Sequence, residues 1–272
     1  MDWSKSKSIF IVVFLILNIF LYTQYVDVYT QGQKVEVLSE KTTEAKLKDD
    51  NITYTTLQDT VGKASYLLGN MRNFEENGLP SNNIAEFQII DDYIVKATFD
   101  NPVLLKDSLN ETVFNEFAST YVYEGNKYVL WDIFEDKRYA LYFQKINERT
   151  VFYNTSGYLK VYWNENNEVY AYEQTMLEKI EQFKQKDSII PQIQVLQALY
   201  TRNLLKPDSQ VIDMNLGYST LVQLPQKQVF APTWEVRVRN ADGQVEEHFV
   251  NAFEGTVLEF EKSSNVLEEE EE

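Results

Sequence analysis

The chain has 272 residues, with 42 acidic against 25 basic side chains and a formal net charge of −17. A surface this acidic repels polyanions, which excludes nucleic acid or anionic lipid as a ligand held by charge. The sequence contains no cysteine, which rules out a disulfide framework and a lipid-modified cysteine anchor, and the chain is long enough to bury a core without such links.

The first predicted element is a transmembrane helix over residues 8–26, which are almost all apolar. About 18 residues at 1.5 Å each nearly cross a hydrocarbon core of roughly 30 Å. Lys5 and Lys7 precede this segment, so residues 1–7 are expected in the cytoplasm and everything after residue 26 outside the cell. A cleaved signal peptide is the alternative, but residues 23–30 are bulky where a peptidase requires small ones. We therefore predict a single-pass protein of the cell membrane.

One polar residue, Asn18, lies in the middle of this apolar segment. An amide in hydrocarbon either bonds its own backbone or finds a partner helix, where the bond contributes about 0.6 kcal/mol on average. The sequence leaves both alternatives open. The predicted face for a partner helix comprises Asn18, Ile11, Phe14, Leu15, Leu21 and Tyr22.

Residues 27–50 are polar and mixed in charge, and they predict a membrane-proximal stalk that is helical in part. A first α+β subdomain is predicted over residues 51–186. Two strands are expected around Asp91 and Asp92, followed by a helix that a capping box opens at Ser108 and Glu111. An antiparallel meander then covers residues 128–176, because aromatic and polar residues alternate there between Gly, Asn and Asp turns.

A second α+β subdomain is predicted over residues 187–262, again as a helix followed by strands. Asp187 or Ser188 is expected to cap the helix, with Pro191 in its first turn. Its expected buried stripe is Ile189, Ile193, Leu196 and Tyr200. Residues 263–272 form an acidic tail. The predicted fold class is thus α+β, with a transmembrane helix followed by an extracytoplasmic domain of two subdomains, each a helix packed on an antiparallel meander.

The sequence argues against catalysis. His248 is the single histidine, and one histidine and no cysteine provide neither a usual zinc site nor a cysteine nucleophile. Strand alternation places His248 with Glu246 and Val250, as a strand residue near the surface. The carboxylate clusters at residues 132–136 and 164–168 lack the spacing of a calcium loop. We predict no catalytic residue, no metal and no cofactor.

The opening residues, MDWSKSKSIFIVVFLILNIFL, closely resemble the start of proteins of the YycI family. Similar stretches occur at residues 47–54, 198–205, 229–238 and 250–257, so the resemblance covers essentially the whole chain. The acidic tail is not part of that pattern. The resemblance implies a non-enzymatic, single-pass membrane regulator of the sensor histidine kinase YycG, also called WalK. It implies that the chain acts with a companion, YycH, through contacts between transmembrane helices in a system that governs cell-wall metabolism.

The alternative is an extracytoplasmic module, similar to PepSY-type inhibitors, that binds wall fragments or a peptide. This alternative requires a pocket with aromatic walls and a few convergent polar groups. A third possibility, an envelope hydrolase, requires two carboxylates about 5–10 Å apart in a cleft.

Overall fold

The computed structural model describes residues 13–23, 41–58, 62–78, 84–105, 109–224 and 226–260. Contacts divide the chain after Lys46 into two compact units. In the first unit, residues 13–23 form a helix. The remainder of the predicted span, which includes Ile11, lies outside the described residues, and so do Lys5, Lys7 and the predicted acidic tail. Among the helices that the structure describes, none combines the length and apolar character needed to cross a membrane.

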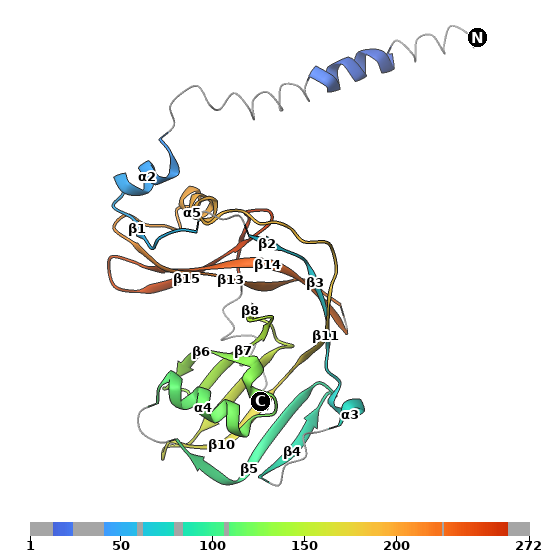
Figure 1. The fold of residues 1–272 in the computed structure, drawn as a ribbon, viewed down its shortest axis with the longest axis vertical. Helices are drawn as coiled ribbons and strands as arrows, with labels where there is room; N and C mark the ends of the chain where they lie inside the picture. The colour runs from blue at the N-terminus through green and yellow to red at the C-terminus, as the bar shows by residue number, and fades with distance from the viewer. Residues whose placement is uncertain are drawn as a thin grey trace, which may run out of the picture. The chain divides into compact units, whose positions relative to one another are not determined.

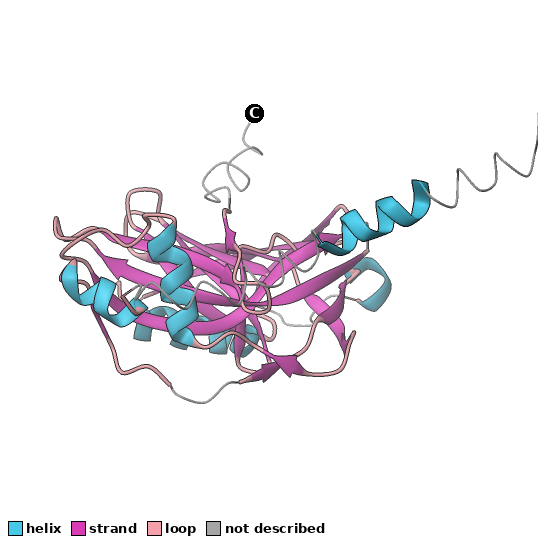
Figure 2. Ribbon diagram, turned by 90° about the horizontal axis from the view of Figure 1, so that it is seen from above, coloured by secondary structure: helices cyan, strands magenta, loops and turns pink. Residues whose placement is uncertain are grey.

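Strands are the predominant secondary structure among the described residues of the second unit (Figure 2). Ten of them form the main path of one sheet: β3 (Leu67–Met71), β4 (Ala85–Ile90), β5 (Ile94–Leu104), β7 (Tyr139–Ile146), β8 (Arg149–Phe152), β9 (Tyr158–Trp163), β10 (Glu168–Gln174), β11 (Leu177–Gln182), β13 (Gln210–Gln223) and β14 (Lys227–Arg239). Their spatial order is β11-β3-β14-β13-β8-β7-β9-β10-β5-β4. All neighbours on this path are antiparallel except β8 and β13.

Further strands lie beside this path or apart from it. Those that join the sheet beside its main path are β1 (Thr53–Tyr54), β6 (Tyr128–Phe134), β15 (Val245–Asn251) and β16 (Val257–Leu258), while β2 (Lys63–Ala64) and β12 (Asp187–Ser188) pair with each other. The short helices are α2 (Thr43–Asp49), α3 (Phe74–Asn77) and the 3₁₀ turn η1 (Gly125–Lys127).

Helix α4 (Glu111–Tyr121) covers one half of the sheet, which we call the α4 half and define as β4–β7, β9 and β10 (Figure 1). Phe114 and Phe117 are buried there against Phe99 and Trp163. The predicted capping box is wrong in its capping residue: Asn110 is the N-cap, and Ser108 lies outside the described residues. The Asn110 side chain accepts a hydrogen bond from the Val113 N–H at 3.1 Å, which satisfies one orphan donor of the first turn.

Helix α5 (Gln192–Thr201) packs on the other half, which we call the α5 half: β1, β3, β11 and β13–β16 (Figure 1). Its N-cap is Pro191, so the predicted cap is wrong. Asp187 and Ser188 instead form β12, which pairs with β2. The fully buried apolar residues of the helix are Val195, Leu196 and Leu199. Ile193 and Tyr200, which were expected to be buried, are half-buried at the edge of the same core, whereas Ile189, just before the helix, is buried.

The two halves meet at β8, which pairs antiparallel with β7 and parallel with β13. A two-residue turn of Asn147 and Glu148 joins β7 to β8, with φ of 50° and 61°, the backbone of a tight hairpin that follows the strand twist. Gly217 of β13 lies so close to β8 that an added Cβ would be 2.4 Å from the Thr150 carbonyl oxygen. Glycine is therefore required there by contact between the halves.

The α+β class and the antiparallel sheets predicted from the sequence are confirmed. The pairings cross the predicted boundary near residue 186, because β1 pairs with β13, β2 with β12, and β3 with β14. Strands from residues 53–71 therefore belong beside the C-terminal strands. The proposed subdomain limits themselves stay a prediction.

Candidate functional site

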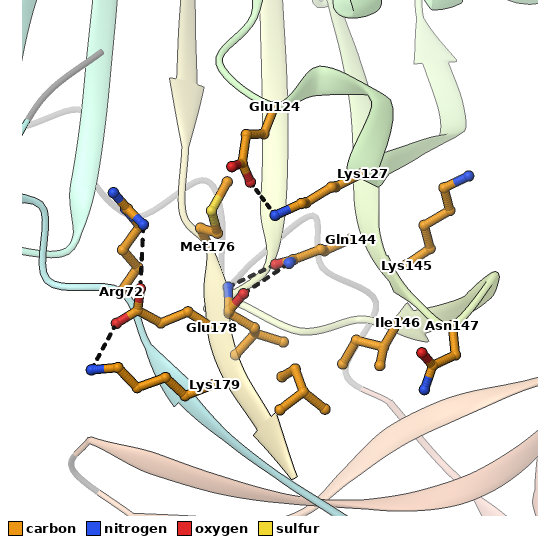
Figure 3. A pocket seen from close by; sticks show the side chains of 12 residues that line it. Arg72, Glu124, Lys127, Gln144, Lys145, Ile146, Asn147, Met176, Glu178 and Lys179 are labelled. Carbon is orange, nitrogen blue, oxygen red and sulfur yellow. Dashed lines mark hydrogen bonds and ion pairs between the residues drawn. The ribbon is translucent and has the colours of Figure 1, made fainter. Parts of the chain in front are cut away.

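A pocket of about 310 Å³ opens where β3 and β11 of the α5 half meet β7 and η1 (Figure 3). Four of its twelve lining residues are cations, Arg72, Lys127, Lys145 and Lys179, and two are acids, Glu124 and Glu178. The pocket is therefore locally positive, although the chain carries a net charge of −17.

Arg72 follows β3 directly and is held at the pocket from several sides. Its backbone N–H donates to the Met176 carbonyl oxygen at 2.8 Å. The centre of its guanidinium lies 5.5 Å from the ring centroids of both Phe74 and Tyr123, close enough for cation–π attraction. Nη1 lies 3.3 Å from Glu178 Oε2. Nε is buried and has no hydrogen-bond partner among the described residues.

Gln144 fixes the floor of the pocket. Its Nε2 donates to the Leu177 carbonyl oxygen at 2.9 Å, and its Oε1 accepts from the Leu177 N–H at 2.7 Å. This amide therefore ties β7 to β11, two strands that are not neighbours in the sheet. Lys145, the next residue, extends away from Arg72 and Lys179 in Figure 3 and pairs with Glu148 at 2.8 Å.

The backbone around the pocket is strained. Glu124 and Lys179 line it, with φ of 48° and 51°. Residues other than glycine rarely adopt this left-handed conformation, and such strain is concentrated at functional sites. Lys127 forms an ion pair with Glu124, and Lys179 lies 3.5 Å from Glu178.

A second charged cluster joins the two halves of the sheet. The Arg237 guanidinium lies 5.2 Å from the Trp131 ring, and its Nε is 2.7 Å from Glu235 Oε1 and 3.5 Å from Glu247 Oε1. The Tyr153 hydroxyl donates to Glu247 Oε2 at 3.1 Å. Burial raises the pKa of the Glu247 carboxyl and of the Tyr153 hydroxyl. These groups link β14 and β15 to Trp131 of β6 and to Tyr153, which directly follows β8.

The residues predicted for helix contact lie partly within the described helix of residues 13–23. Phe14, Leu15, Leu21 and Tyr22 are exposed there. Asn18 Nδ2 donates to the Phe14 carbonyl oxygen at 2.9 Å, four residues earlier. An asparagine amide has two N–H donors and one carbonyl acceptor, so this bond leaves capacity for a partner. The contact face stays a prediction.

His248 lies on β15, the strand in which it was predicted, but it is less exposed than a surface residue. Its side chain is 11% exposed, and Nε2 is 3.6 Å from Glu246 Oε2. Burial lowers the pKa of the His248 imidazole, although Glu246 opposes this. In the described part of the chain, no group of three or more His, Cys, Asp or Glu side chains is placed to hold a metal.

Trp234, an aromatic residue of β14, packs in the core beneath α5 with Val236 and Val238 and is not among the residues that line the pocket described above. Its Nε1–H donates to the Ile190 carbonyl oxygen at 3.3 Å. The pocket of Arg72 lies elsewhere. Sequence reasoning missed that pocket because Arg72 and Glu178 are 106 residues apart in the chain, and no local motif marks either one.

Comparison with known proteins gives the decisive observation: residues 32–253 match the family described as YycI protein. The chain belongs to the YycI family. YycI proteins are regulators of the YycFG two-component system, so the resemblance predicted from the sequence is confirmed.

The chain also has a structural likeness to an uncharacterized protein from Eubacterium rectale ATCC 33656. The two share 9% sequence identity with a TM-score of 0.40, over 78% of this chain and 91% of that one. At this level the likeness carries no functional argument. No curated protein matches the chain.

Proposed function

We propose that this YycI-family chain is a membrane-anchored, non-enzymatic regulator of the sensor kinase YycG (WalK), acting together with YycH. The membership of residues 32–253 in a family that regulates the YycFG system carries the proposal. In it, residues 8–26 span the membrane with residues 1–7 in the cytoplasm, and the strand-rich unit lies outside the cell.

The contact with the kinase runs through the face of the helix that contains Asn18. Exposure does not distinguish this face, because the large apolar side chains on every side of the described helix are exposed. The support is the Asn18 amide, which keeps hydrogen-bonding capacity after its bond to Phe14. Inside a bilayer an apolar helix face is not in contact with water, so packing it against a partner helix gives no hydrophobic gain. Close packing and a polar hydrogen bond must therefore provide the specificity of the helix–helix contact.

Photo-crosslinking in membranes tests this contact. A crosslinking residue at position 18 or 22 is expected to capture the kinase helix or YycH. The matched controls are positions 16 and 20, an isoleucine and a phenylalanine that lie on the opposite side of the same helix. Capture that is equal from both faces, or absent from both, would contradict the proposal.

A chimera separates contact from tethering. Replacing residues 8–25 with the span of an unrelated single-pass protein should abolish control of a reporter gene of the YycFG system while the protein level is unchanged. Normal regulation by the chimera would show that the helix is a tether only.

A further inference from the structure

The locally positive pocket of Arg72 is not explained by contacts between membrane helices. We propose that it binds a small phosphate-type anion through Arg72, Lys127 and Lys179. This inference is independent of the proposed function, because it concerns only the strand-rich unit.

The first argument is the state of Arg72. A guanidinium has five N–H donors, and an arginine whose Nε is buried without a partner has lost hydration without replacement. The rings of Phe74 and Tyr123 hold this group in place. Nε itself has almost no accessible surface, so an anion in the pocket would bind the terminal N–H groups of the guanidinium and would reach Nε only if the side chain shifted.

The second argument is the arrangement of the cations. Arg72 follows β3, Lys127 lies on η1 and Lys179 lies on β11, so they reach the pocket from three elements (Figure 3). A tetrahedral oxyanion accepts hydrogen bonds from several directions, whereas a carboxylate accepts in one plane. The arrangement therefore favours a phosphate group over a carboxylate.

The third argument concerns competition with the protein's own acids. Glu178 and Glu124 pair with these cations. Lys127 and Lys179 are 50% and 67% exposed, whereas Glu124 and Glu178 are 33% and 18% exposed. Because water screens the two lysines, their ion pairs contribute little net stability and can be exchanged for a ligand oxyanion, provided that the two carboxylates turn away from it. The net charge of −17 limits the ligand's size, because a polyanion would also meet the acidic surface around the pocket.

Isothermal titration calorimetry of the full chain in detergent micelles tests the site, with inorganic phosphate as the probe and chloride held constant. We expect saturable binding that is stronger for phosphate than for acetate. Arg72→Gln should weaken it at least about tenfold, the scale of one hydrogen bond between charged groups. The matched control is Arg138→Gln, which removes an exposed arginine paired with Glu165 at 2.9 Å and should leave binding unchanged.

Absence of saturable phosphate binding, acetate binding as strong as phosphate binding, or equal loss in both arginine variants would overturn the proposal. Thermal unfolding of each variant shows whether it is folded. If Arg72→Gln does not fold, Lys127→Gln decides, since the Lys127 side chain is 50% exposed and its loss should not affect folding. Unchanged phosphate affinity in folded Lys127→Gln would then overturn the site.

Discussion

Buried amide side chains join the two halves of the sheet residue by residue. Asn154 donates to Thr220 Oγ1 at 2.7 Å and to Gln228 Oε1 at 2.5 Å, and Gln228 donates to Ser156 Oγ at 2.6 Å. Gln144 and Leu177 form a similar link beside the pocket. A buried polar group must be satisfied or it destabilises the fold, so each of these bonds specifies how the halves meet.

A second prediction at the residue scale concerns His248: because its imidazole is largely buried, we expect the stability of the fold to depend on pH. Burial lowers the pKa of its imidazole below the ordinary value of 6.5, and Glu246 and Lys206 are the charged groups that act on it. The unfolded chain therefore binds the proton more tightly, and stability is lost as pH falls through 6.5 toward the lowered pKa of the folded state.

His248→Gln should remove this loss. Relative to the variant, the wild-type melting temperature is expected to decrease between pH 7.5 and 5.5. Measuring both proteins in the same buffers cancels the titration of groups that they share. A difference between the two melting temperatures that does not change over this range would contradict the burial of His248.

Among the elements, α4 depends on its N-cap for a defined start. The Asn110 backbone is extended, with φ of −133° and ψ of 170°, and its side chain accepts from the Val113 N–H. Asn110→Ala should reduce the free energy of unfolding by about 1 kcal/mol, the usual cost of losing such a cap. Asn110→Asp keeps an acceptor and should remain close to wild type. Urea unfolding of both variants measures the difference, and equal loss in both would contradict the capping role.

Elements with a strong local pattern could be predicted from the sequence. The strands on either side of Asp91 and Asp92 form β4 and β5, and these two turn residues have φ of 49° and 65°. The strands β6, β9 and β15 lie where alternation placed them. β3 and β11 were missed, because each is short and gains its stability from pairing with a distant partner rather than from local pattern.

At the scale of the whole molecule, strands within residues 51–186 pair with strands that follow residue 186. We therefore predict that residues 51–186 do not fold independently. β3 lies between β11 and β14, and β8 pairs with β13, so removing the C-terminal strands exposes strand edges and breaks the buried amide bonds.

A fragment of residues 51–186 should therefore lack cooperative thermal unfolding and dispersed amide NMR signals. A fragment of residues 41–260, which contains both halves, should show one transition and serves as the control. Cooperative unfolding of the shorter fragment would show that the predicted boundary near residue 186 separates two independent subdomains.

The sequence by itself determined the family, the α+β class, most hairpins and the acidic character, because each depends on local pattern or on composition. It also supplied the helix face around Asn18, which remains a prediction. Tertiary structure alone decided which strands pair across the chain, where α4 and α5 begin, and that Arg72, Lys127 and Lys179 line one pocket. The strand pairings and the pocket depend on contacts between residues that are distant in the chain, 157 positions apart in one case, and such contacts leave no periodic signal in the chain.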